Sequence, residues 1–126
     1  MKKHSTFAYV ATPYSKYPEG IEKAYELACG QTAFLLKSDI PVYSPIAATH
    51  GIAIHGNIDP LDHDIWLTAD HPFMELASAL IVCKAESWTE SYGMKYEIEY
   101  FISQHKPIFY MELSEMPEGL KAFYHE

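Results

Sequence analysis

The stretch ALIVCKAESWTESYGMKYEIEYFISQHKPIFYM, residues 79–111, holds two apolar segments on either side of a helical one. Residues 79–83 are continuously apolar, as strands buried on both faces of a parallel sheet are. From Met94, apolar side chains recur at steps of three and four, which predicts a helix to about His105. Residues 107–111 then predict another strand. Parallel strands need a crossover connection, so the stretch predicts a β-α-β unit.

The rest of the chain continues this alternation of strand and helix. Residues 6–12 and 41–44 predict strands, each stopped by a proline, and residues 18–36 carry apolar side chains at helical spacing between them. Residues 65–76 predict another helix, in which Pro72 begins a second piece, and residues 117–124 predict a short closing helix. The class is therefore α/β, with a parallel sheet and helices on both faces.

The polar segment of residues 47–64 is expected to be a loop, since Gly51, Gly56 and Pro60 interrupt it. Its histidines and aspartates resemble a ligand set for a hard metal ion: His50, His55, Asp59, Asp62, His63 and Asp64. Their spacing is not the helical pair of metal hydrolases, so a metal hydrolase is the less favoured interpretation. It would bind metal and lose activity with a chelator.

Composition limits the possible partners. The 126 residues fit one domain, residues 1–126, and carry a formal charge of -8 with no arginine, which argues against a nucleic acid polymer as partner. No apolar run has the roughly 20 residues of a membrane span, and no signal-like segment precedes Pro13, so a cytoplasmic protein without a membrane partner is expected. Cys29 and Cys83 are expected to be buried thiols.

In open parallel sheets, ligands bind beyond the carboxyl ends of the strands, which here selects the loops of residues 13–17, 45–64 and 84–93. Glu97 lies one loop beyond the strongest strand and within the apolar stripe of its helix. It is either a partly buried glutamate whose charge a lysine or tyrosine meets, or a nucleophile. A poorly solvated carboxylate can attack an acetal-like carbon and form a covalent glycosyl intermediate.

Two further residues have both a structural and a functional interpretation. Tyr9, in the first strand, is either a core residue or a hydroxyl that fixes a carboxylate at the sheet edge. Asp70 is favoured as the N-cap of a following helix, and otherwise exchanges a proton with a leaving group. Neither a dinucleotide fingerprint nor a P-loop is present.

Read together, AYVATPYS, VYSPI, Asp70 with ASALIV, and ESYGMKYEIEYFISQHKPIFYM resemble the nucleoside 2-deoxyribosyltransferase-like superfamily, over residues 6–111. The resemblance implies a flavodoxin-like fold of four to five strands that cleaves the N-glycosidic bond of a nucleoside or its 5′-monophosphate. It makes Glu97 the nucleophile, Tyr9 its positioning residue and Asp70 the aspartate near the base. It further implies a homodimer or larger homo-oligomer, and neither metal nor organic cofactor.

The substrate-binding residues expected from this resemblance are Pro13, Tyr14, Ser15, Ser91 and Gly93. Serine at position 91 favours a nucleoside monophosphate, since a hydroxyl with helix N-terminal amides can hold phosphate. Glu90 and the absence of arginine count against a strong phosphate site.

Departures from the superfamily pattern are Glu99, where glycine is common, Ser78, where aspartate is common, and a chain end that leaves a fifth strand short or missing. Transfer to a base and hydrolysis by water both remain open. A non-catalytic nucleotide sensor on the same fold is the main alternative, and it would bind ligand without turnover.

Overall fold

The strand β3 (Ala79–Cys83) lies at the centre of the sheet, paired on both sides, in the computed structural model that describes residues 6–125. Its neighbours are β1 (Ala8–Ala11) and β4 (Ile108–Met111), and β1 also pairs with β2 (Val42–Tyr43). Within the described residues the sheet has four strands, all parallel, in the order β2-β1-β3-β4. This is the strand order of flavodoxin-like folds without a fifth strand.

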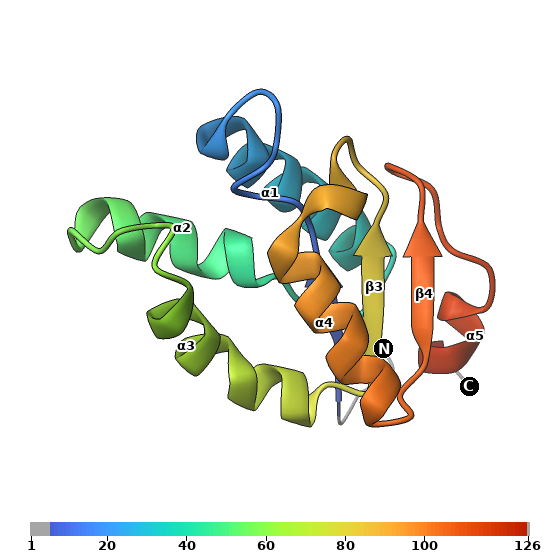
Figure 1. Cartoon of the computed structure of the whole chain (residues 1–126). Coiled ribbons are helices and arrows are strands. Elements are labelled where there is room, and N and C mark those ends of the chain that lie inside the picture. The colour runs from blue at the N-terminus through green and yellow to red at the C-terminus, as the bar shows by residue number, and fades with distance from the viewer. Residues whose placement is uncertain (1–5, 126) are drawn as a thin grey trace.

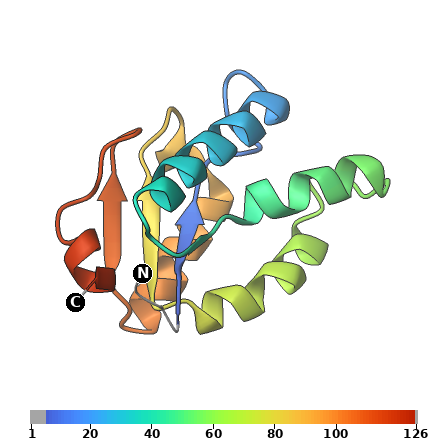
Figure 2. The ribbon, with the colours of Figure 1, turned by 180° about the vertical axis from the view of Figure 1, so that it is seen from behind.

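The predicted α/β class is confirmed, and the helices cover both faces of the sheet (Figures 1 and 2). On one face, the alternate side chains Ala8 and Val10 of β1 pack with helices α1 (Ile21–Lys37) and α5 (Leu120–His125). On the other face, Tyr9 and Ala11 pack with residues of helix α4 (Tyr92–Ser103). Because strand side chains alternate between faces, each strand contributes to both cores.

Residues 45–55 form helix α2 (Pro45–His55), so the prediction of a loop over residues 47–64 is wrong for most of its length. Ser44 caps this helix, because its hydroxyl accepts a hydrogen bond from the backbone N–H of Ala47 at 3.2 Å. Pro45 suits the first helical position, where no N–H is needed. These signals at the helix start outweigh Gly51, which lies inside the helix.

Helix α3 (His63–Leu76) is continuous, with Pro72 inside it. Asp70 therefore lies in the interior of a helix, and its prediction as an N-cap is wrong. Proline is tolerated in the first turn of an α-helix, where its missing N–H is not needed. Pro72 lies in the interior of α3, which therefore lacks one backbone hydrogen bond. Figure 1 shows α2 and α3 extending sideways from the sheet on the side away from β4.

Smaller corrections concern the ends of elements and two exposures. Helix α1 begins at Ile21 and not at Pro18, after Gly20, whose φ of 95° is in the region that favours glycine. Helix α4 ends at Ser103, and Ile102 of its predicted apolar stripe is 60% exposed. Cys29 is only partly buried, while Cys83 is buried as predicted.

Candidate active site

A pocket lies at the carboxyl edge of the sheet. The chain after β1 continues to β2 on one side, and the chain after β3 continues to β4 on the other side, so the strand order reverses between β1 and β3. Its empty volume, which includes solvent at the open mouth, is about 790 Å³. Its walls come from the end of β1 and from helices α2, α3 and α4. Its polar lining residues include Tyr9, Thr12, Tyr14, His50, Asp70 and Glu97.

Glu97 reaches the pocket from the second turn of α4 and is partly buried. Burial raises the pKa of its carboxyl to about 8. The nearby Asp70 adds to this rise, while a contact with the Tyr9 hydroxyl lowers the pKa. Helix α4 is fixed at its start by Ser91, whose hydroxyl accepts from the Met94 N–H at 3.2 Å. The turn that carries Glu97 is therefore held in place relative to the sheet edge.

Tyr9 has its ring fully buried in the sheet core and its hydroxyl at the pocket. Its ring centroid lies 6.0 Å from that of Tyr43 and 5.9 Å from that of Phe101. Burial first, and then the carboxyls of Glu97 and Asp70, raise the pKa of Tyr9 above its ordinary range. The hydroxyl forms no hydrogen bond of standard geometry with any of residues 6–125, although it lies close enough to Glu97 to lower the pKa of that carboxyl. Tyr9 is thus protonated and held to one orientation.

Asp70 enters the pocket from α3, and burial raises its pKa to about 6. Its buried Oδ1 has no hydrogen-bond partner among residues 6–125, and the same holds for Thr12 Oγ1 and for the Tyr9 hydroxyl. Buried polar atoms are nearly always hydrogen-bonded, so these three oxygens around one pocket are open to partners from outside the protein, namely water or a polar ligand. Two carboxyls with raised pKa values in a pocket are also typical of active sites.

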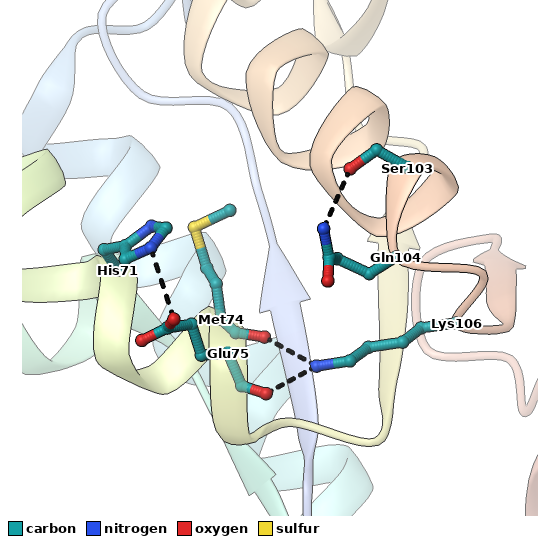
Figure 3. A network of polar contacts seen from close by, with 6 residues as sticks. All are labelled: His71, Met74, Glu75, Ser103, Gln104 and Lys106. Atoms are coloured by element: carbon teal, nitrogen blue, oxygen red, sulfur yellow. Dashed lines mark hydrogen bonds and ion pairs between the residues drawn. The ribbon is translucent and has the colours of Figure 1, made fainter.

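The two helices that carry the carboxyls are joined at their far ends (Figure 3). Lys106, just after α4, donates hydrogen bonds to the carbonyl oxygens of Met74 at 3.1 Å and Glu75 at 2.6 Å, in the last turn of α3. A cation at a helix C-terminus interacts favourably with the helix dipole. The ring of His71 on α3 also meets that of Tyr100 on α4, with centroids 5.4 Å apart. These contacts fix the separation of Asp70 and Glu97.

The structure brings most of the other expected site residues to the same pocket. Tyr14, Ser15, Ser91 and Gly93 line it, whereas Pro13 is buried and is not part of the lining. Ser91 is itself buried, and its hydroxyl oxygen accepts the hydrogen bond that caps α4. The place of these residues agrees with a binding role, and the roles themselves stay predictions.

Over residues 6–113 the chain matches a family model described as a domain of unknown function, DUF1937. The chain belongs to the DUF1937 family. The match covers the sheet, helices α1 to α4 and every pocket residue named above. A comparison of the DUF1937 chain with curated proteins found no match.

Sequence patterns missed two of the pocket residues. Thr12 was treated as the end of a strand, and only its burial without a hydrogen-bond partner identifies it. His50 was grouped with metal ligands, but it is buried, and its Nδ1 lies 2.6 Å from the Tyr14 hydroxyl while its Nε2 lies 3.3 Å from Glu22. Its spacing of three residues from the apolar Ala53, which puts both on one helical face, could have indicated burial, had α2 been recognised.

Residues 6–125 of the DUF1937 chain bring together no group of three histidine, cysteine or acidic side chains that could hold a metal ion. His50 and His63 line the pocket, and the other members of the expected ligand set do not. None of the helices in the described part of the chain has the length and apolar character to span a membrane.

Proposed function

We propose that this protein cleaves the N-glycosidic bond of a nucleoside or nucleoside 5′-monophosphate, with Glu97 as nucleophile. The observation that carries the proposal is the meeting of Glu97, Asp70 and Tyr9 at one pocket, where both carboxyls have raised pKa values. Further support comes from the apolar part of the lining, which includes Trp66 and Leu67 and suits a flat base.

In the first step, a carboxylate oxygen of Glu97 bonds to C1′ of the sugar as the C1′–N bond breaks. The electron pair of that bond goes to the base nitrogen, which takes a proton from Asp70. Tyr9 donates toward Glu97 and holds its reacting oxygen. In the second step, water or another base attacks C1′ and releases Glu97, while the proton of the attacking water or base goes to Asp70. Two displacements on one carbon retain the configuration at C1′.

The test is to incubate the protein with purine and pyrimidine deoxynucleosides and their 5′-monophosphates and to measure the released free base by chromatography. Glu97→Gln is expected to lower the rate by about a thousand-fold or more, since the amide is not a nucleophile. Glu99→Gln is the matched control: it is exposed, two residues further along α4 and outside this pocket, so its rate is expected to match the wild type. No base release from any substrate at high enzyme concentration would count against catalysis.

A non-catalytic nucleotide sensor is the second candidate. It is favoured by the raised pKa of Glu97, about 8, which leaves this carboxyl mainly protonated at neutral pH and able to donate a hydrogen bond. A sensor would bind its ligand without turnover, and Glu97→Gln would leave the affinity nearly unchanged. Calorimetry with the same set of ligands separates the two candidates.

We also propose that the protein works as a homo-oligomer. Helix α2 has no charged side chain other than its histidines, and a helix that is apolar all round is usually covered on all sides. Large apolar side chains of α2 and α3 are nevertheless exposed in the single chain, namely Ile52, Ile54, Ile65, Phe73 and Leu76. A second copy of the chain would cover them.

A further inference from the structure

A second polar network, separate from Glu97, Asp70 and Tyr9, forms part of the pocket wall. The Tyr14 hydroxyl lies 2.6 Å from His50 Nδ1, and His50 Nε2 lies 3.3 Å from Glu22 Oε1. The ring of Tyr25 stacks on the imidazole of His50, with centroids 4.4 Å apart and planes at 20°. His50 is thus fixed by three neighbours, and Tyr14 by His50.

The Glu22 carboxylate at the end of this network determines which of its atoms carry hydrogens. An ionised carboxylate only accepts, so Nε2 of His50 must carry the hydrogen that points to Glu22. In the neutral imidazole Nδ1 is then an acceptor, and the Tyr14 hydroxyl donates its single hydrogen to it. What Tyr14 presents to the pocket is therefore oxygen lone pairs. A ligand group at this point must supply an O–H or N–H.

The charges around the pocket act in the same direction. Among the described residues that line it are the carboxyls of Asp70 and Glu97 and two histidines, His50 and His63, but no lysine. The chain has no arginine at all. Lys16, next to the lining residue Ser15, is exposed and does not contribute to the lining. A phosphate dianion would thus meet a pair of carboxyl groups that shares one negative charge, without a lysine or arginine to bind it.

The start of α4 does not compensate for this lack. The first N–H groups of a helix have no partner within the helix and can bind an anion. One of these in α4, the Met94 N–H, already donates to the Ser91 hydroxyl. Ser91 is buried and occupied with this cap. The helix N-terminus therefore offers fewer donors to a phosphate than the serine at position 91 leads one to expect.

We infer that the pocket selects an uncharged nucleoside over its 5′-monophosphate, and that Tyr14 contributes to this choice by accepting a hydrogen bond from the 5′-hydroxyl, which the monophosphate lacks. His50 and Glu22 are positioning residues that keep the hydrogen of Tyr14 away from the ligand. The inference rests on the proposed function, because it names which member of that substrate class the site takes.

Binding is measured by calorimetry with Glu97→Gln, which prevents turnover, and kcat/KM is measured with the wild type. A 2′-deoxynucleoside is expected to bind at least about tenfold more tightly than its 5′-monophosphate, since desolvating a phosphate without a cation is unfavourable. Equal or tighter binding of the monophosphate overturns the inference, as does a failure of both ligands to bind.

The role of Tyr14 is tested with analogues that lack one hydroxyl each, the 2′,5′-dideoxynucleoside and the 2′,3′-dideoxynucleoside. The 2′,5′-dideoxynucleoside is expected to bind roughly three- to tenfold more weakly than the parent, and this difference should vanish in Tyr14→Phe, whereas the effect of removing the 3′-hydroxyl should not change in that variant. Tyr17→Phe, in the same loop but outside the pocket lining, is the control and should keep the difference. Differences that persist in Tyr14→Phe would show that Tyr14 does not select the ligand.

The role of His50 is tested by the tautomer of its imidazole, which a purely structural role would not require to be the Nε2–H form. Nitrogen NMR of the imidazole is expected to show the Nε2–H tautomer, with Nδ1 shifting in Tyr14→Phe. A protonated imidazole or the Nδ1–H tautomer at neutral pH would overturn the assignment. His50→Gln should narrow the preference for nucleoside over monophosphate, whereas His55→Gln, exposed on the same helix, should not.

The two proposals fail in different ways. Faster base release from a monophosphate than from its nucleoside leaves the N-glycosidase function standing and removes the selectivity. Tight nucleoside binding without any base release keeps the selectivity and removes the enzyme.

Discussion

In the proposed mechanism Glu97 must be ionised to attack carbon, and yet it lies where ionisation is unfavourable. Burial raises its pKa to about 8, and the proximity of Asp70, whose own pKa is raised to about 6, adds to the effect. At neutral pH the pair thus holds about one proton, mostly on Glu97. The reacting arrangement has that proton on Asp70, which leaves Glu97 as a carboxylate and Asp70 as an acid.

This sharing predicts a bell-shaped dependence of kcat/KM on pH. The rate should rise as one proton leaves the pair, with an apparent pKa near 6, and fall as the second leaves, with an apparent pKa near 8. Asp70→Asn should remove the proton donor and lower the rate by about a hundredfold or more for bases that leave poorly. Initial rates of base release across this pH range check the prediction, and a rate that keeps rising above pH 8 would contradict it.

The same pKa predicts how stability depends on pH. Between the ordinary value of 4.5 and about 8, folded Glu97 keeps a proton that the unfolded chain releases. The free energy of unfolding should therefore fall as pH rises through this window, and Asp70 acts in the same direction between 3.8 and about 6. Glu97→Gln should weaken the dependence, whereas Glu99→Gln should not. Urea unfolding across the window is the measurement, and an unchanged slope in Glu97→Gln would refute the burial of this charge.

At the scale of elements, the site depends on two helices that meet at an angle and are tied at one end. Helix α3 contributes Asp70, yet among its residues Met74 alone is buried, so packing holds this helix weakly. The hydrogen bonds from Lys106 to the carbonyls of Met74 and Glu75 provide a second attachment. The pocket therefore depends on a residue at the opposite end of the helices that form it.

Replacing this lysine should affect both stability and activity. Lys106→Met keeps the length of the side chain but leaves two carbonyls without their donor, so a loss of about 1–2 kcal/mol in the free energy of unfolding is expected. The value of kcat should fall as well, because Asp70 moves with α3. Lys95→Met, exposed on α4, is the control. Urea unfolding and rates of base release are measured side by side, and a stable variant with wild-type kcat would show that the tie does not position the site.

At the scale of the whole molecule, α2 and α3 extend beyond the sheet and carry exposed apolar side chains (Figure 1). An apolar arm of this kind is unfavourable in water unless something covers it. Leu76 of α3 is 71% exposed and Ile52 of α2 is 55% exposed.

We expect the protein to associate with itself through this arm. Sedimentation equilibrium should give a mass of two or more chains, and the paired change Ile52→Lys with Leu76→Lys should shift it to the monomer by placing like charges in the interface. Ile102→Lys changes an exposed apolar residue of α4, outside the arm, and serves as the control. A wild-type protein that is monomeric at high concentration would contradict the proposal.

Much of the fold was predictable from local pattern. The continuous apolar run of β3, the proline stops after β1 and β2 and the helical spacing in α1 and α4 all reflect interactions between near neighbours in the sequence. The loop prediction for residues 47–64 failed because two glycines and a proline outweighed the Ser44 cap and Pro45, which start α2. The pattern favours Asp70 as a cap because Pro72 is expected to begin a new helical piece, but α3 continues through this proline.

The sequence by itself determined the α/β class, the edge at which a ligand site would form and Glu97 as the unusual residue in an apolar stripe. Tertiary structure alone decided that Tyr9, Asp70 and Glu97 reach one pocket, and that His50 contacts Tyr14 and Glu22. The reason is physical: periodicity records which face of an element is buried, whereas a pocket depends on how distant elements pack and on the burial that shifts each pKa.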